Sequence, residues 1–555
     1  MNSNRPSFLP LKPFNRYSQK LWSGVAICLI LLLLTATIQA TVVNQKLSGK
    51  MPSFGDVIGV PPFRISPDGS TVVYIADQET ESAFELWRTP IDGSSPPLRL
   101  SGLLPTQKGI EAFAISSDSS RVIYMAEQDT SEVVELYTVP LEGGAITKLN
   151  SPLLNDWDVA DFQISPDSSR VVYRAGNQED MAFNLYSVPL AGGSVIKLNS
   201  EITPIEGGVF DFEISPDSSR VVYLGDQQAN ERFELYSVLL AGGMRVKLNS
   251  PFVDDEDVLN FQISPDSSRV IYFADEQTDE VFELYSVPLG GGTAIKLNGP
   301  LVSDGSIFSY YQISPNSSRV IYLADQQIVN TLELYSVPLT GGVVTKLNGS
   351  LVSGGDVTEF FQISPNSSRV IYYADQQSND SYELYSVPLA GGIVTKLNDP
   401  LVSGGSVFGL FHISSDSKRV VYRADQQTDE VFELYSVPLA GGTVTKLNGP
   451  LVTGGNVLID FKISPNSSRV FYIADQQTDE VFELFNVPLA GGAVTRLNDS
   501  LVNGGDVYSG FRISPDNHRI VYRADQQTDE MDELFVAFDD GKPDFVIYLP
   551  FIEGS

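Results

Sequence analysis

One element recurs ten times along the chain, and this repetition limits the possible folds more than any other feature of the sequence. Successive copies are 49 or 50 residues apart, and a period in this range is typical of repeat architectures. The copies of this "ISPD"-like element begin at Ile65, Ile115, Ile164, Ile214, Ile263, Ile313, Ile363, Ile413, Ile463 and Ile513.

A single repeat unit reads as four short strands joined by turns. The predicted strands are residues 411–414, 419–424, 431–439 and 443–448. β-branched and aromatic residues dominate them, whereas "SDSK" and "AGG" are typical turn sequences. The polar stretch "DQQTDE" joins the second strand to the third. No helical period of 3.6 residues occurs in the unit, so the chain is predicted to be all-β.

Four antiparallel strands per repeat are typical of a blade of a β-propeller. A blade cannot bury both of its faces alone, but it can do so between two neighbours. We therefore predict one ring of ten four-stranded blades. Two rings of five blades, or an open curved array, are the alternatives, although no linker interrupts the spacing between Ile263 and Ile313.

An aromatic residue stands two places before the isoleucine of every "ISPD"-like element. A position that is filled ten times by a large ring is expected to lie in the core between blades, because buried aromatic area dominates protein cores. These residues are Phe63, Phe113, Phe162, Phe212, Phe261, Tyr311, Phe361, Phe411, Phe461 and Phe511.

The two ends of the repeat array predict how the ring closes. The last unit has a third strand at residues 533–538 but no repeat-like fourth strand. Residues 46–57 align without gaps to residues 346–357, which makes residues 42–48 an unpaired fourth strand at the N-terminus. We expect this strand to complete the last blade. Residues 544–551 are the competing candidate.

The first forty residues resemble a secretory signal, with a basic flank, a short apolar core and a small residue at the end. We predict a signal peptide or an N-terminal anchor at 1–40, the propeller at 41–543, and a C-terminal strand or tail at 544–555. Any membrane contact would be through residues 21–40, if they are not removed. The only cysteine, Cys28, lies there, so no disulfide is expected beyond it.

Acidic residues far outnumber basic ones. The net charge is −33, and without the leader 32 basic residues face 69 acidic ones, a net charge of −37. Such a surface repels nucleic acid and attracts cations and basic partners.

"RISPDGSTVVYIAD" at residues 64–77, with the later "ELWRTPIDG", resembles the WD-like (SPDG-type) repeat of the TolB-like propellers. The resemblance extends over nearly all of residues 42–540 and implies the fold more than a function. TolB has an α/β domain before its blades, and propeller peptidases add a hydrolase domain. Neither domain is evident here, and no G-x-S-x-G motif occurs.

Few residues point to chemistry. Histidine occurs only at His412 and His518, which argues against zinc sites and cysteine–histidine catalysis. The position of His412 is taken in other blades by several polar types, so we expect a channel wall there rather than a fixed catalytic role. The other occupants are Gln163, Glu213, Gln262, Gln312, Gln362, Lys462 and Arg512.

Carboxylates recur in the loops after the second and fourth strands, and we expect them to gather on one face of the ring. Calcium ligands are candidates, although the spacing is not that of an EF-hand. The calcium candidates are Asp425, Asp429, Glu430, Asp475, Asp479 and Glu480. The candidates for partner binding are Asp254, Asp255, Glu256, Asp257 and His412.

These observations together predict an exported monomer, in the periplasm, at the cell surface or outside the cell, that is not an enzyme. It would act as a binding or scaffold module for a protein or glycan, with no cofactor and no nucleic-acid partner. A calcium-binding propeller is the alternative, and a hydrolase of unknown class is a remote one. Repetition of the carboxylates in blade after blade is the main argument against one active site.

Overall fold

The structure is a computed structural model that describes residues 44–52, 55–104, 108–130, 132–154, 156–179, 182–200, 207–227, 232–251, 257–278 and 280–538. The predicted leader at 1–40 and the predicted tail at 544–555 lie outside these ranges, so both assignments stay predictions. In the described ranges, no helix has the length and apolar character needed to cross a membrane.

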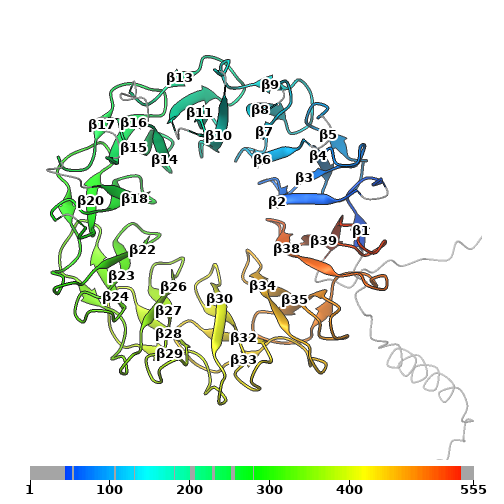
Figure 1. The fold of residues 1–555 in the computed structure, drawn as a ribbon. Helices are drawn as coiled ribbons and strands as arrows, with labels where there is room; N and C mark the ends of the chain where they lie inside the picture. Colours follow the sequence, from blue (N-terminus) through cyan, green and yellow to red (C-terminus); the bar gives the residue numbers. More distant parts are fainter. Residues whose placement is uncertain are drawn as a thin grey trace, which may run out of the picture. The chain divides into compact units, whose positions relative to one another are not determined.

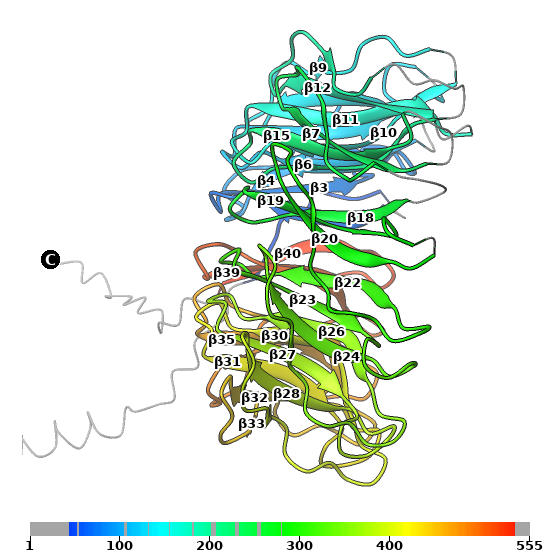
Figure 2. The same ribbon diagram turned by 90° about the vertical axis from the view of Figure 1, so that its left-hand side faces the viewer.

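Within these ranges, forty strands form ten four-stranded sheets, which stand as blades around an open central channel (Figure 1). Figure 2 shows the same ring from the side, with neighbouring blades stacked against one another. The prediction of an all-β ring of ten four-stranded blades is confirmed. Blade 1 consists of β2–β5, the next eight blades follow in chain order, and blade 10 consists of β38, β39, β40 and β1.

Each blade is an antiparallel meander that runs from the channel outward. The innermost strands are β2 (Val57–Ile65), β6 (Ile110–Ile115), β10 (Trp157–Ile164), β14 (Val209–Ile214), β18 (Val258–Ile263), β22 (Ile307–Ile313), β26 (Val357–Ile363), β30 (Val407–Ile413), β34 (Val457–Ile463) and β38 (Val507–Ile513). The second strands are β3 (Thr71–Ala76), β7 (Arg121–Ala126), β11 (Arg170–Asn177), β15 (Arg220–Gly225), β19 (Arg269–Ala274), β23 (Arg319–Ala324), β27 (Arg369–Ala374), β31 (Arg419–Ala424), β35 (Arg469–Ala474) and β39 (Arg519–Ala524).

The third strands are β4 (Glu85–Pro90), β8 (Glu135–Pro140), β12 (Ala182–Pro189), β16 (Glu234–Leu239), β20 (Glu283–Pro288), β24 (Glu333–Pro338), β28 (Glu383–Pro388), β32 (Glu433–Pro438), β36 (Glu483–Pro488) and β40 (Glu533–Phe538). The outermost strands are β5 (Leu98–Arg99), β9 (Thr147–Lys148), β13 (Ile196–Lys197), β17 (Val246–Lys247), β21 (Ile295–Lys296), β25 (Thr345–Lys346), β29 (Thr395–Lys396), β33 (Thr445–Lys446), β37 (Thr495–Arg496) and β1 (Asn44–Lys46).

The outermost strand is shorter than the sequence pattern predicts. In blade 8 the ladder between β32 and β33 covers only Thr445 and Lys446. Beyond it, a side chain takes the place of the backbone, because Asn448 Oδ1 accepts a hydrogen bond from the Leu434 amide at 2.9 Å. The asparagine of "KLN" therefore ends the strand and still satisfies the buried backbone.

The N-terminal strand closes the ring, as the gap-free alignment predicts. β1 pairs antiparallel with β40, with Asn44 opposite Ala537 and Lys46 opposite Phe535. Figure 1 shows the blue N-terminal strand beside the red last blade. Ser48 Oγ accepts the hydrogen bond of the Leu534 amide at 3.1 Å, so it replaces the asparagine used elsewhere. The competing segment 544–551 lies outside the described residues.

The hydrophobic core lies between blades. One cluster joins Ile321 and Leu334 of blade 6 to Phe361, Tyr372 and Tyr385 of blade 7. Phe361 belongs to the recurring aromatic position, whose members are buried except for Phe162, which is half-buried. Burial of a large apolar side chain contributes about 1.5–3 kcal/mol, so a neighbour on each side stabilises every blade.

The tight turn after each innermost strand links neighbouring blades. Ser417 has a φ of 57°, and its Oγ accepts a hydrogen bond from the Asn366 amide of the preceding blade at 3.0 Å. The same contact recurs around most of the ring, for example between Asp217 and Ser267. The change from "SPDG" to "SPDS" is therefore explained: serine takes a left-handed conformation that suits glycine better, but it supplies an acceptor that glycine lacks.

Candidate ligand site on the channel wall

The position of His412, immediately after the buried aromatic residue of each innermost strand, has a repeated structural use. In four blades it holds a glutamine whose Nε2 donates to the backbone carbonyl of the equivalent aromatic residue in the next blade. These bonds are Gln163 to Phe212 at 2.8 Å, Gln262 to Tyr311 at 3.1 Å, Gln312 to Phe361 at 2.7 Å and Gln362 to Phe411 at 2.9 Å. The glutamines thus join the innermost strands of neighbouring blades.

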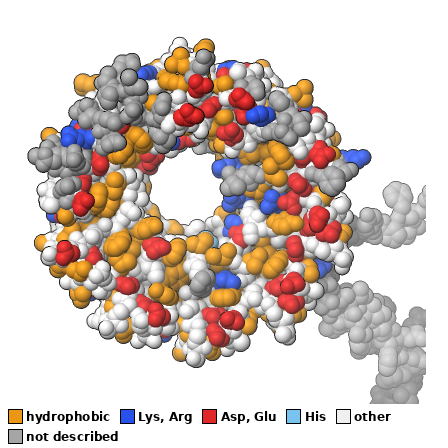
Figure 3. Space-filling view, in the orientation of Figure 1, with side chains coloured by type: hydrophobic (Ala, Val, Ile, Leu, Met, Phe, Trp, Pro, Cys, Tyr) orange, Lys and Arg blue, Asp and Glu red, His pale blue; other side chains and the backbone are white. Residues whose placement is uncertain are grey.

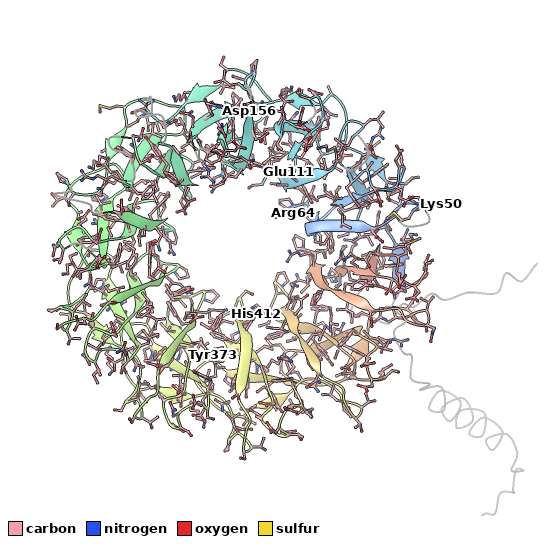
Figure 4. The ribbon with its side chains drawn as sticks, viewed as in Figure 1. Lys50, Arg64, Glu111, Asp156, Tyr373 and His412 are labelled. Atoms are coloured by element: carbon pink, nitrogen blue, oxygen red, sulfur yellow. The ribbon has the colours of Figure 1, made fainter. Side chains whose placement is uncertain are left out.

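In three successive blades this position holds a lysine or an arginine instead of a glutamine. Lys462 lies on β34, Arg512 on β38 and Arg64 on β2, and we call these three residues the basic arc. Closure of the ring makes Arg64 and Arg512 neighbours despite their separation in sequence. Figure 4 shows Arg64 at the edge of the channel, and Figure 3 shows basic side chains gathered on that side of it.

The basic arc concentrates positive charge in a strongly acidic protein. Lys462 Nζ forms an ion pair with Asp460 at 2.6 Å and lies 4.0 Å from the centre of the Phe511 ring. Within the described ranges, neither Arg64 nor Arg512 forms an ion pair with a carboxylate. Partial burial lowers the pKa of Arg64, and the charge of Arg512 lowers it further. Two arginines that repel each other in this way are suited to an anion.

A cavity of about 330 Å³ lies between these two arginines. Its wall comes from blades 10, 1 and 2 and includes Arg64, Ser66, Ala114, Arg512 and Pro515. In blade 2 the recurring polar position holds Ala114, so no long side chain fills the space there. The cavity therefore has two guanidinium groups and room for a small ligand or for one end of a larger one.

His412 lies on β30, one blade before Lys462, and Figure 4 shows it at the channel. It packs edge-on against Phe461, with ring centres 5.0 Å apart. Burial lowers the pKa of His412, and the charge of Lys462 lowers it further, against opposing effects of Asp460 and the Phe461 backbone. The imidazole is therefore neutral at neutral pH and can accept a proton. Whether His412 contacts a partner stays a prediction.

The position holds a carboxylate only at Glu213, in blade 4 on β14. Its Oε2 accepts a hydrogen bond from the Ile263 amide at 2.9 Å. Glu213 therefore links blades 4 and 5 as an acceptor, whereas the glutamines link their blades as donors. Burial raises the pKa of Glu213 to about 7, and the nearby Asp211 adds to the rise. The basic arc and Glu213 thus give the channel wall an uneven charge that the repeat itself would not produce.

The loops predicted to hold calcium use part of their carboxylates internally. Asp425 is buried, and its two oxygens accept hydrogen bonds from the Ser406 amide at 2.6 Å and the Glu430 amide at 3.2 Å. Asp475 does the same for the next blade, with Asn456 and Glu480 as donors.

The remaining calcium candidates are exposed. Asp429 lies against Gly404, and Asp479 lies against Gly454. Glu430 and Glu480 have φ values of 61° and 60°. In the part of the chain that the structure describes, no group of three or more His, Cys, Asp or Glu side chains is placed to hold a metal ion.

The acidic stretch predicted for partner binding is described only at its end. Asp254, Asp255 and Glu256 lie outside the described residues. Asp257 Oδ1 accepts a hydrogen bond from the Phe233 amide at 2.7 Å, and its own amide donates to Asp275. A role of these four residues in binding stays a prediction.

Sequence reasoning noted that Lys462 and Arg512 share a position but not that Arg64 joins them. Arg64 follows Lys462 and Arg512 only in a closed ring, where blade 1 lies next to blade 10. In that order lysine, arginine and arginine stand in succession, which no other three blades repeat.

Ten four-stranded blades around an open channel define the chain as a β-propeller. No family model matches it, and no curated protein sequence matches it. Among solved structures it is similar to Porphyromonas gingivalis dipeptidyl peptidase 4, with 11% identity over 92% of this chain and 67% of that one, at a TM-score of 0.45. It is also similar to an oligogalacturonate lyase in complex with manganese, with 12% identity over 63% of this chain and 98% of that one, at a TM-score of 0.35.

A TolB-like protein from Agrobacterium tumefaciens is similar at 15% identity, over 53% of this chain and 94% of that one, with a TM-score of 0.27. At such identities the likeness is one of fold and assigns no activity.

The comparisons nevertheless correct two predictions made from the sequence. The chain was expected not to be an enzyme and to act only in binding or as a scaffold, but solved structures that are similar in fold include enzymes, so the fold is no ground for either expectation. The physical error lies in the argument from repetition. A repeated carboxylate does not exclude a single active site, because one site can form wherever individual blades depart from the repeat, as they do at the basic arc.

Proposed function

We propose that the ring binds an anionic ligand on the channel wall, with the basic arc as its binding site. The observation that carries this proposal is the pair Arg64 and Arg512, which repel each other and have no carboxylate partner in the described part of the chain. An anion that lies between the two guanidinium groups would accept hydrogen bonds from both and remove their repulsion.

The ligand class follows from the chemistry of the two arginines. A guanidinium group offers several N–H donors in a plane and binds carboxylate or phosphate oxygens in pairs. The net charge of −33 opposes the approach of an anion from a distance, so the ligand must be held by short-range hydrogen bonds. The cavity of about 330 Å³ between the arginines accommodates such a group.

A binding experiment tests this proposal. Isothermal titration of the intact chain with polygalacturonate and with polyglutamate, two polyanions of different backbone, should show binding that a neutral dextran lacks. Arg512→Gln and Arg64→Gln should each weaken binding at least about tenfold, because a hydrogen bond to a charged group contributes about 1.5–3 kcal/mol.

Lys418→Gln is the matched control for these variants. Lys418 lies in the turn between β30 and β31, its side chain is 78% exposed, and its loss changes the net charge as much as the loss of one arginine. If Lys418→Gln weakens binding as much as Arg512→Gln does, binding depends on overall charge and the basic arc is not the site. If neither polyanion binds, the proposal is wrong.

A second candidate function is acid–base catalysis on the bound anion. The observation that favours it is the set His412, Asp460 and Lys462 on neighbouring innermost strands, where burial and Lys462 keep the imidazole neutral. A neutral imidazole accepts a proton, while the lysine stabilises negative charge that develops nearby.

Product formation tests this second candidate. The intact chain is incubated with each polyanion that it binds, and new reducing ends, new amino groups and new ultraviolet absorbance are followed over time. His412→Gln places the glutamine of four other blades at this position, so we expect it to retain binding and to lose turnover. Equal turnover in both proteins would exclude His412 as the base.

We also propose that the repeats belong to the TolB-like, SPDG-type class and that the protein is exported. The turn "SPDG" at residues 66–69 and the basic and apolar leader support these two points. Sequencing the N-terminus of the protein purified from its host tests export, since removal of the leader should leave a new N-terminus near residue 41.

A further inference from the structure

Exposed apolar side chains line one part of the channel wall. Phe308 and Tyr310 of β22, Phe360 of β26, Leu410 of β30 and Ile459 of β34 are each at least 39% exposed. They lie in successive blades, on the part of the innermost strand that precedes the buried aromatic residue. Tyr310, Phe360 and Leu410 stand directly before that aromatic residue, Ile459 one place earlier and Phe308 two places earlier. We call these five residues the apolar crescent. Figure 3 shows apolar side chains along the lower edge of the channel, where these blades lie in Figure 1.

A bulge of three residues accounts for the exposure of the crescent. In β26, Val357 pairs with Ala374 and Phe361 with Tyr372, so the three residues 358–360 face the single residue 373. In blade 3, by contrast, Val159 and Asp161 pair with consecutive residues of β11, so only Ala160 is extra. A bulge of this kind releases the chain from its partner strand and turns side chains away from the sheet.

The crescent includes a concave site. A cavity of about 200 Å³ lies between the innermost strands of blades 6, 7 and 8. Phe360 and Leu410 line it together with Phe361 and Phe411. Gln312, Glu359 and Gln362 also line it, so the hollow combines apolar and polar side chains, as binding sites commonly do.

The crescent is continuous with the basic arc. Ile459 and Lys462 lie on the same strand, β34, so one surface ends where the other begins. Gly409 has a φ of 81°, and a Cβ atom there would lie 3.0 Å from Ile459 Cδ1, so the absence of a side chain leaves room for Ile459 at the channel. The wall from blade 6 to blade 1 thus combines an apolar stretch with a basic one.

We infer that this wall binds an extended peptide segment that carries both apolar and acidic side chains. The inference rests on the proposed function for its acidic part, because the basic arc would hold the carboxylates. The apolar part follows from the crescent, since aliphatic Leu410 and Ile459 gain most from contact with apolar side chains. The aromatic rings of Phe308, Tyr310 and Phe360 offer flat faces to apolar side chains and to a sugar ring alike. An acidic oligosaccharide is the competing ligand, and the experiment distinguishes the two.

The experiment uses three short synthetic peptides labelled with a fluorophore, and fluorescence anisotropy measures their binding to the intact chain. The first alternates leucine with aspartate, the second replaces leucine by serine, and the third replaces aspartate by lysine. We expect the first peptide to bind at least tenfold more tightly than either of the others, because each loses one of the two kinds of contact.

Variants of the protein locate the contact. Phe360→Ser and Leu410→Ser should each weaken binding of the leucine–aspartate peptide about tenfold. Ile393→Ser is the matched control, because Ile393 is 84% exposed in the turn between β28 and β29, outside the channel wall. All three substitutions replace exposed side chains, and thermal unfolding of each variant confirms that it is folded.

Each remaining outcome overturns this inference in a different way. If the serine–aspartate peptide binds as tightly as the leucine–aspartate peptide and Arg512→Gln abolishes both, the basic arc binds anions but the crescent has no part. If polygalacturonate binds in a manner that depends on Phe360 and the peptides do not bind, the ligand is an acidic oligosaccharide. If none of these ligands binds, both the inference and the proposed function are wrong.

Discussion

Lys46 in β1 and Glu533 in β40 form an ion pair across 487 residues of sequence. The same pair occurs within other blades, for example between Lys446 and Glu433. Glu433 has a second partner, because the Tyr435 hydroxyl donates to its Oε2 at 2.8 Å. The equivalent residue in blade 10 is Phe535, and Glu533 Oε2 accepts no hydrogen bond in the described part of the chain. Lys46 is therefore more important at the seam than Lys446 is within a blade.

This difference predicts the relative stability of two alanine variants. Lys46→Ala leaves the Glu533 carboxylate, 3% exposed, without a partner and should reduce the free energy of unfolding by about 3 kcal/mol. Lys446→Ala should cost less, because Tyr435 still donates to Glu433. Urea unfolding measures both, and the double variant Lys46→Ala/Glu533→Gln should recover stability. Equal losses in the two single variants would contradict this interpretation.

The conformation of Ser417 predicts that its replacement by glycine costs less stability than its replacement by alanine. Ser417→Ala removes the acceptor of the Asn366 amide and keeps a side chain at a φ of 57°, so we expect a loss of about 1–2 kcal/mol. Ser417→Gly also removes the acceptor, but it relieves the left-handed strain of about 1 kcal/mol, so the glycine variant should be close to the wild type. Thermal unfolding of both variants compares them, and an alanine variant as stable as the glycine variant would exclude a role for backbone strain.

Glu213 makes stability depend on pH. Its pKa of about 7 in the folded protein lies above the ordinary value of 4.5, so between these values the folded state holds a proton that the unfolded chain has released. Stability therefore falls as pH rises through this window. Glu213→Gln keeps an acceptor for the Ile263 amide and should raise the free energy of unfolding at pH 8 by about 1–3 kcal/mol. The gain should shrink toward pH 4.5, and a gain of the same size at both pH values would contradict the role of titration.

The internal bonds of Asp425 predict the effect of removing calcium. Because the Ser406 and Glu430 amides already occupy both carboxylate oxygens, chelation with EDTA should leave the Tm unchanged. Asp425→Asn should lower stability by about 1–3 kcal/mol with or without calcium, since its amide nitrogen would face a backbone N–H. A rise in Tm with calcium that is lost in Asp425→Asn would instead establish a metal site in this loop.

The fold could be predicted from the sequence because equivalent residues of every repeat pack against the neighbouring blade in the same way. The aromatic residue at Phe361 and its equivalents, the glycine turns and the alignment of residues 46–57 with 346–357 sufficed for the blades and for the seam. Strand lengths were less predictable, because the Asn448 side chain replaces ladder bonds that a pattern of apolar residues cannot distinguish.

The candidate site was harder to predict because it depends on departures from the repeat. The basic arc exists only once Arg64 and Arg512 are known to be neighbours, and that knowledge requires the closed ring. The apolar crescent depends on bulges such as residues 358–360, which read as ordinary strand in the sequence. The mistaken exclusion of an enzyme has the same origin. It considered the residue that recurs at each position and not the blades in which another residue stands there.

Closure by β1 also orders events during biosynthesis. A chain is made from its N-terminus, so the strand at residues 44–46 leaves the ribosome before every other strand of the ring, and its partner at residues 533–538 leaves after all of them. Nine blades can assemble while this strand stays unpaired, and the ring closes only when the last blade has been made. Release of a truncated product would therefore leave an unsealed arc with β1 still free, which a chaperone or protease could recognise as unfinished.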